Sequence, residues 1–212
     1  MKLNNILLIA ILFFSQCIKK RLNPYDAGNP QAWTSINLDV TKYRNGDEIP
    51  QVQDASWGYL TTGAWCYYEN NSANGAKYGK LYNWYAVNDP RGLAPAGYRI
   101  PSNEDWTILI ENLGGKIVYE SIDSKAGTKM KSKNGWDNDG NGTNSSGFNG
   151  LPGGYRDFNG DFGNVGANGY WWNSSDIYYQ RLSYGDGSYD GFNEVRLAYG
   201  EQNGFSVRCI RD

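Results

Sequence analysis

Closely spaced turn signals in the second half of this chain limit how long any helix or strand there can be. Glycine after asparagine or aspartate favours a tight turn, because both positions accept backbone conformations that other residues avoid. Such pairs include residues 134–135, 139–140, 141–142, 186–187 and 190–191. We therefore expect short elements joined by irregular loops in this half.

The clearest helix signal lies at residues 102–113. Ser102 follows Pro101 and is a good N-cap, with acidic residues in the first turn after it. Four apolar residues then share one helical face: Trp106, Leu109, Ile110 and Leu113. Gly114 and Gly115 end the segment. One amphipathic helix is predicted here.

Other elements are predicted from weaker patterns. Leu81, Trp84 and Tyr85 share a face of a second helix over residues 78–87, although these aromatic residues also suit a strand. Short strands are predicted at residues 98–100 and 205–210, the latter half-buried because apolar and polar residues alternate. The expected class is α+β, with about two helices packed on small, mainly antiparallel sheets and long irregular loops.

The first 16 residues have the features of a secretory signal. A lysine precedes an apolar run at residues 6–14, which is shorter than the roughly 20 residues that a membrane-spanning helix needs. Cys17 follows in a context that resembles a bacterial lipobox, with Gln16 in place of the usual glycine or alanine. Residues 1–16 are therefore predicted to be a signal peptide. Residues 17–35 are predicted to be a lipidated cysteine and a spacer.

Lipidation at Cys17 predicts that a membrane is the first partner of this protein. By resemblance to known sorting signals, Ile18 permits delivery to the outer membrane, facing either the periplasm or the cell surface. The alternative is a plain secretory signal followed by an incidental cysteine.

Cys66 and Cys209 are the cysteines left if Cys17 carries lipid. In an oxidising compartment they are expected to form a disulfide that ties the early part of the domain to its last strand. The alternative is two separate buried thiols that behave as small apolar side chains.

Composition excludes several classes of function. The chain has no histidine, which removes the commonest general base and metal ligand. Its net charge is −2 with no basic stripe, so nucleic acid is not an expected partner. No cofactor is expected apart from calcium, which oxygen ligands alone can bind.

Six short blocks stand in one order along the chain. They are YRNGD (43–47), YGKLYNWYAV (78–87), GYRIPS (97–102) with Trp106, LPGGYR (151–156), GYWW (169–172) and GFSVRC (204–209). Together they resemble the Fibrobacter succinogenes major paralogous domain, which implies that residues 36–212 form one such domain. This family is common in lipoproteins, in agreement with the prediction for Cys17.

The same blocks are more distantly similar to the C-type-lectin-like fold, including its sulfatase-modifying branch. The resemblance implies that the N- and C-terminal strands join and that a long loop region, here residues 173–203, carries ligands. Enzymes of that branch use copper and a reactive cysteine pair near the C-terminus. This chain has only Cys209 there, so that chemistry is not implied.

Residues 171–203 combine many aromatic side chains with serine, asparagine, aspartate and arginine. This mixture is typical of recognition surfaces, and aromatic faces also stack on sugar rings. The predicted ligand-binding residues are Trp172, Tyr178, Tyr179, Arg181, Tyr184, Tyr189 and Tyr199. The alternative is that half of these aromatic residues fill the core. Of Trp171 and Trp172, one is expected inside and the other outside.

A loop rich in aspartate and asparagine follows Trp136. Asp137, Asp139 and Asn141 match the first ligand positions of an EF-type calcium loop. Phe148 stands where that loop needs a bidentate acid, so a true EF-hand is excluded. A looser calcium site and a solvated turn cluster are the two alternatives.

Three functions are compatible with these features. The leading hypothesis is a membrane-anchored binding module for glycan or another surface ligand, without enzymatic activity. The first alternative is a polysaccharide-active enzyme with two carboxylates, drawn from Asp157, Asp161, Asp176 and Glu194, although nothing in their spacing selects a pair. The second is a structural envelope protein without a small ligand.

Overall fold

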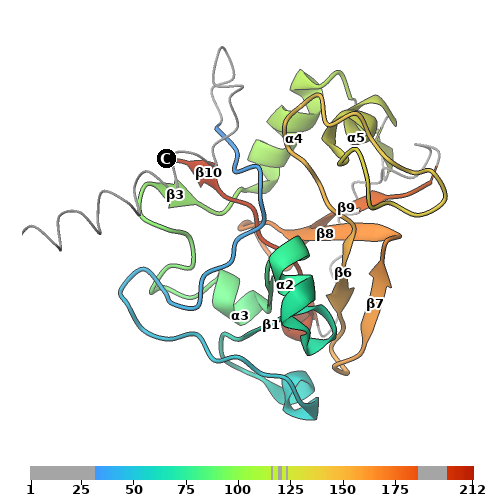
Figure 1. The fold of residues 1–212 in the computed structure, drawn as a ribbon. Helices are drawn as coiled ribbons and strands as arrows, with labels where there is room; N and C mark the ends of the chain where they lie inside the picture. Colours follow the sequence, from blue (N-terminus) through green and yellow to red (C-terminus); the bar gives the residue numbers. More distant parts are fainter. Residues whose placement is uncertain (1–31, 116, 119–120, 123, 186–199) are drawn as a thin grey trace, which may run out of the picture.

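The computed structural model describes residues 32–115, 117–118, 121–122, 124–185 and 200–212. Short helices and short strands alternate along the chain in an α+β arrangement, as predicted, but the described ranges hold four α-helices where about two were expected (Figure 1). In chain order they are η2 (Ala55–Tyr59), β1 (Trp65–Cys66), η3 (Tyr68–Asn70), α2 (Ser72–Tyr78), β2 (Leu81–Tyr82), α3 (Trp84–Val87), β3 (Tyr98–Arg99), α4 (Asn103–Asn112), β4 (Ile117–Val118), β5 (Ser121–Ile122), α5 (Ser124–Met130), β6 (Gly153–Arg156), β7 (Phe162–Val165), β8 (Asn168–Trp172), β9 (Tyr179–Ser183), η4 (Gly200–Gln202) and β10 (Ile210–Arg211).

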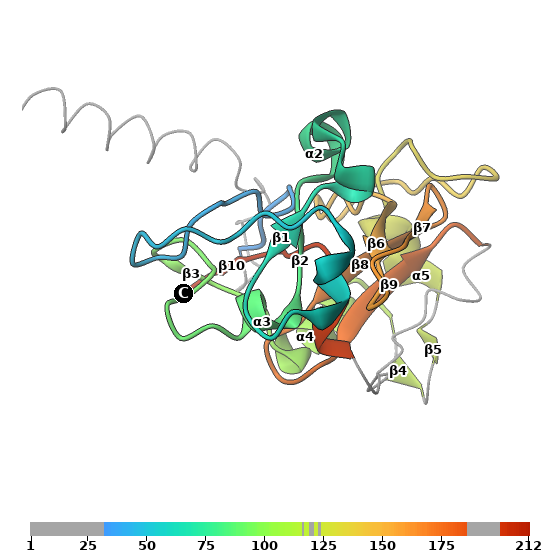
Figure 2. The ribbon, with the colours of Figure 1, turned by 90° about the horizontal axis from the view of Figure 1, so that it is seen from below.

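The largest sheet has four strands in the order β7-β6-β8-β9. Its β6–β7 and β8–β9 pairs are antiparallel, whereas β6 and β8 run parallel and pair through Gly154 and Gly169. The smaller pairs β1–β2, β3–β10 and β4–β5 are all antiparallel. The prediction of mainly antiparallel sheets is confirmed. Both ribbon views place α5 beside β9, the edge strand of the large sheet (Figure 1 and Figure 2).

The two ends of the domain lie side by side. Trp33 forms a bridge with Ile210, and the blue start of the described chain runs next to β10 in Figure 1. Trp33 is only 3% exposed, and its ring centroid lies 4.6 Å from that of Trp106. The predicted boundary at residue 36 is therefore wrong, because the segment assigned to the spacer already supplies a core side chain.

The predicted amphipathic helix is confirmed as α4. The Ser102 hydroxyl accepts from the backbone N–H of Asp105 at 3.3 Å, and the Asp105 carboxylate accepts from the backbone N–H of Ser102 at 2.8 Å. This reciprocal capping box satisfies two donors that would otherwise lack partners at the helix start. The helix then buries the apolar residues of its predicted face, Trp106, Leu109 and Ile110.

The predicted helix over residues 78–87 is wrong as a single element. Gly79 adopts φ of 78° and ends α2, a conformation that glycine accepts without the steric cost of a Cβ. After Lys80, Leu81 and Tyr82 form β2, which pairs with β1, and the Asn83 side chain then caps α3. The apolar face is thus divided between a strand and a separate short helix.

Trp171 and Trp172 point to opposite faces of β8, as consecutive strand residues must. Both are buried, with exposed fractions of 1% and 0%, because each face of the sheet is covered. Trp171 packs with Trp106 and Met130 from α4 and α5, whereas Trp172 belongs to the cluster of Phe205. The expectation that one of the two faces solvent is wrong.

The C-terminal segment 203–210 is buried at every position, so the prediction of a half-buried strand is also wrong. Arg208 is its largest polar side chain and is 0% exposed. Its guanidinium donates to Asn37 Oδ1 at 2.7 Å and to the backbone carbonyls of Thr34 at 2.7 Å and Asn149 at 3.0 Å. Three oxygens from distant segments thus allow a charged residue to lie inside the core.

The capping box should contribute less to stability in acid. Burial raises the pKa of Asp105, but hydrogen bonds from Arg99 and Ser102 outweigh burial and hold this pKa below its usual value. A carboxyl with a lowered folded-state pKa stabilises the fold above its unfolded pKa, and this contribution is lost as the pH falls through the folded pKa.

Asp105→Asn should therefore lower the free energy of unfolding by about 1–2 kcal/mol at pH 7. The difference from the wild type should shrink progressively as the pH falls below the ordinary Asp pKa of about 4. Urea unfolding at both pH values measures this. An equal deficit at both would contradict the account.

Candidate functional site

A cleft lies where the end of α5, the loop 137–142 and the end of β9 meet. Its volume is about 420 Å³, within the range of about 300–1,000 Å³ that is typical of small-ligand pockets. Two segments that the sequence analysis selected separately, the Asp/Asn-rich loop and the aromatic segment 171–203, therefore come together. The cleft is lined by Thr128, Lys131, Asn138, Asp139, Gly140, Asn141, Tyr184 and Gly185.

Glycine at position 140 lets the loop lie directly on Tyr184. A Cβ on Gly140 would come within 2.2 Å of the Tyr184 carbonyl oxygen and 2.6 Å of its Cα. The loop turns through Asn138 and Asp139, whose φ angles are 48° and 59°, a conformation that asparagine and aspartate accept more readily than most residues. The Asp-Gly pair that predicts a turn therefore also sets how closely the two walls of the cleft approach.

Lys131 brings a positive charge to the wall of the cleft. The residue follows α5 and is only 3% exposed. Its ammonium donates to the Ser183 carbonyl at 3.0 Å and lies 5.5 Å from the centroid of the Trp136 ring. The cleft therefore combines the Asp139 carboxylate and two asparagine amides, groups that bind hydroxyls, with a buried ammonium that is held by the Ser183 carbonyl.

Tyr184 is the exposed aromatic residue of the cleft. Its side chain is 38% exposed, and its backbone N–H donates to the Ala167 carbonyl at 2.9 Å, which holds the residue at the end of β9. A tyrosine ring offers an apolar face together with a polar hydroxyl. Of the predicted ligand-binding residues that the structure describes, Tyr184 is the one that lines this cleft.

Of the other predicted ligand-binding residues, none that the structure describes lines the cleft with Tyr184. Trp172 is 0% exposed, so its assignment to a binding surface is wrong. Two of the residues lie outside the described ranges: Tyr189 and Tyr199. Three are half-buried on β9 or directly before it: Tyr178, Tyr179 and Arg181. Of the seven residues, those that the structure describes therefore do not form a single aromatic surface.

The predicted calcium ligands have different surroundings. Asn141 Oδ1 accepts from the backbone N–H of Trp136 at 3.1 Å. The Asp137 carboxylate packs against Gly166, where a Cβ would lie 2.6 Å from Asp137 Oδ1, and it does not line the cleft as Asp139 does. In the ranges described above, no three Asp, Glu, Cys or His side chains gather to hold a metal. A looser calcium site and a solvated turn cluster both stay predictions for this loop.

The carboxylates considered for an enzyme have local backbone partners. Asp157 accepts from the backbone N–H groups of Asn159 at 2.8 Å and Asp161 at 2.9 Å, and so closes the turn between β6 and β7. The Asp176 carboxylate accepts from the N–H of Ile177 at 2.8 Å. These two carboxylates shape turns, and Glu194 lies outside the described residues.

Cys66 and Cys209 are free, buried thiols, so the expected disulfide is wrong. They belong to different core clusters, one around Trp57 and the other around Phe205. Burial raises the pKa of each thiol to about 12, which leaves almost no reactive thiolate at neutral pH. The structure agrees with the alternative, in which the two cysteines are separate buried thiols.

Sequence reasoning missed Lys131 and Thr128, which complete the cleft. Both lie at the end of α5, a helix that the sequence analysis did not predict. Lys131 alternates with Lys129 and Lys133, and no local pattern distinguishes it from them. Its burial next to Trp136 becomes evident only in the folded chain.

The comparisons with known proteins identify the family of this chain. In the described ranges, no helix is long and apolar enough to cross a membrane. No curated protein and no solved structure matches the chain. The family model described as the Fibrobacter succinogenes major domain matches residues 28–211, which include most of the predicted domain 36–212. The chain therefore belongs to the Fibrobacter succinogenes major domain family.

Proposed function

We propose that this protein is a lipid-anchored module of the bacterial cell envelope that binds a glycan in the cleft between Tyr184 and residues 138–141. The observation that carries the proposal is the pairing of an exposed tyrosine with amide, carboxylate and ammonium groups in one cleft of about 420 Å³. Sugars present apolar ring faces and many hydroxyls, so they need both kinds of group at once.

The polar side of the cleft favours binding over hydrolysis. A glycosidase of the usual kind needs two carboxylates that flank the bond to be cleaved. Among the described residues that line the cleft, Asp139 is the one carboxylate. One acid with two amides can hold hydroxyl groups but does not supply the acid and base of that reaction.

The chain course supports a C-type-lectin-like arrangement as part of this proposal. Such folds join their first and last strands and place a long loop region before the last strands. Here Trp33 pairs with Ile210, and β10 follows the segment 173–203. The cleft includes Tyr184 from that segment, which is where ligands are expected in this fold.

Binding should depend on the aromatic wall of the cleft. In a glycan array with the purified protein, Tyr184→Ala should weaken binding about tenfold or more, because stacking on the ring is lost. Tyr59→Ala is the matched control, since Tyr59 is 87% exposed on η2, outside the cleft. Equal affinity of both variants, or no bound glycan with folded protein, would contradict the proposal. Capture of a constant protein partner instead would favour a structural role.

The lipid anchor rests on the sequence around Cys17, which lies outside the described residues. Cells grown with radiolabelled palmitate should incorporate label into the wild-type protein. The Cys17→Ser variant should carry no label and should leave the membrane fraction. Persistent labelling of this variant would show that Cys17 is not the lipidated residue.

A further inference from the structure

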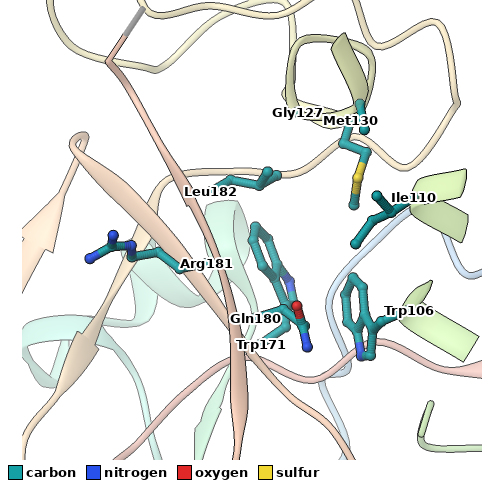
Figure 3. Close-up of a pocket in the computed structure, with 9 residues that line it drawn as sticks. Trp106, Ile110, Gly127, Met130, Trp171, Gln180, Arg181 and Leu182 are labelled. Atoms are coloured by element: carbon teal, nitrogen blue, oxygen red, sulfur yellow. The ribbon is translucent and has the colours of Figure 1, made fainter. Parts of the chain in front are cut away.

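Arg181 belongs to β9, and its side chain projects from the face of the strand that points away from α4 and α5. A small pocket of about 20 Å³, large enough for about one water molecule, separates those helices from the strand. In Figure 3, Leu182 and Trp171 turn toward Met130 and Ile110, whereas the Arg181 guanidinium extends away from them. Arg181 therefore belongs to the other face of the large sheet.

The guanidinium of Arg181 is incompletely partnered among the described residues. Its Nε is buried without a hydrogen-bond acceptor, although the residue is half-buried. In the part of the chain that the structure describes, Arg181 forms no ion pair. Arg156 and Arg208, the other arginines there that are not exposed, donate to four and three oxygens. Because unpartnered buried donors are costly, an external acceptor would stabilise Arg181.

Two tyrosines lie next to Arg181 on this face. Tyr170 is its direct partner in the β8–β9 register, and the Tyr170 hydroxyl accepts from Asn164 Nδ2 at 2.8 Å, which leaves the hydroxyl proton for another acceptor. Tyr179 is half-buried, and its ring centroid is 5.6 Å from that of Tyr170. Burial and Tyr170 raise the pKa of Tyr179, while the nearby charge of Arg181 lowers it.

The charges of Asp157 and Arg181 determine which end of this face can bind an anion. Tyr155 packs against Tyr170 with a centroid separation of 5.2 Å. Burial raises the pKa of Tyr155, and Coulombic interactions with Tyr170 and Asp157 add to this effect. Asp157 therefore repels an anion at the Tyr155 end, whereas Arg181 attracts one at the other end.

We propose that Arg181, Tyr179 and Tyr170 form a second site, distinct from the cleft, that binds the carboxylate of an acidic sugar. The guanidinium matches a carboxylate with two parallel N–H donors. The hydroxyl of Tyr170, a residue that is 6% exposed, adds a donor, and the half-buried Tyr179 ring offers a surface for the sugar ring. Uronic acids unite a carboxylate with a sugar ring and are the ligand class that fits both features.

The Arg181 Nε–H resonance of ¹⁵N-labelled protein reports on this site directly. Tetragalacturonate should shift this resonance, whereas the carboxyl-reduced tetrasaccharide should not. Arg181→Gln should weaken binding of tetragalacturonate about tenfold or more. Arg181→Lys should restore only part of the affinity, because an ammonium lacks the planar pair of donors. The matched control is Arg211→Gln, an exposed arginine on β10 whose loss should change nothing.

Three results would overturn the proposal. The first is an unmoved Arg181 resonance in the wild-type protein, a measurement that does not require any variant to fold. The second is an equal shift with acetate at the same carboxylate concentration, since the sugar ring would then contribute nothing. The third is loss of tetragalacturonate binding in Tyr184→Ala but not in Arg181→Gln. Because Tyr184 lines the cleft, this third result would place the acidic sugar there, whereas failure of glycan binding at the cleft leaves the Arg181 site intact.

Discussion

Arg208→Met should lower the free energy of unfolding by about 3–5 kcal/mol, one of the two largest effects expected in this protein. The guanidinium is fully buried and connects two segments far apart in the sequence, one with Thr34 and Asn37 and the other with Asn149. It also lies 4.5 Å from the centroid of the Phe148 ring. Methionine fills a similar volume but donates no hydrogen bond, so buried oxygens would lose their partner.

Burial lowers the pKa of Arg208 to about 9, so the side chain is charged at neutral pH, where the comparison should be made. Urea unfolding of the wild type and of Arg208→Met gives the difference. Arg211→Met provides the control, because Arg211 is exposed and its replacement should change stability by less than about 0.5 kcal/mol. A similarly small change for Arg208→Met would show that its hydrogen bonds do not stabilise the fold.

Trp172→Ala should lower the free energy of unfolding by about 3–5 kcal/mol. The ring lies 4.6 Å from Phe205 and 5.4 Å from Trp84 between centroids, and its Nε1 donates to the Tyr82 carbonyl at 2.7 Å. Alanine would leave a cavity and a buried carbonyl without its donor. Trp172 therefore stabilises the core and does not contact a ligand.

Trp172→Phe separates packing from the hydrogen bond. It keeps an aromatic ring in the core and should cost less than the alanine variant, with most of the loss due to the Tyr82 carbonyl. Urea unfolding of both variants measures the two contributions. If Trp172→Ala were as stable as the wild type, Trp172 could not be the core residue that the structure describes.

The parts of the fold that sequence could predict are those fixed by neighbouring residues. The start of α4 depends on Ser102 and Asp105, three positions apart, and the turn at 139–140 depends on one dipeptide. The single helix over 78–87 failed because β2 is stabilised by β1, which the local pattern does not reveal. In the same way, the alternation of side chains along a strand predicts that Trp171 and Trp172 point to opposite faces. It does not predict that both faces of the sheet are covered.

The sequence could identify residues of the site by their type, but it could not predict that they lie together in one cleft. Tyr184, Asp139 and Asn141 were selected for two separate reasons, as an aromatic recognition residue and as calcium ligands. Their contact depends on the approach that Gly140 permits and on Lys131, which only the folded chain brings to the same wall. The same holds for Arg181, whose incomplete partnering is a property of the folded sheet.

The most direct test of the account is a map of backbone amide shifts in ¹⁵N-labelled protein titrated with the strongest neutral glycan from the array. We predict that the largest shifts fall at residues 138–141 and 184–185, and that they disappear in Tyr184→Ala but not in Tyr59→Ala. Shifts confined to other parts of the molecule, or unchanged by loss of the Tyr184 ring, would contradict the claim that this cleft is the binding site.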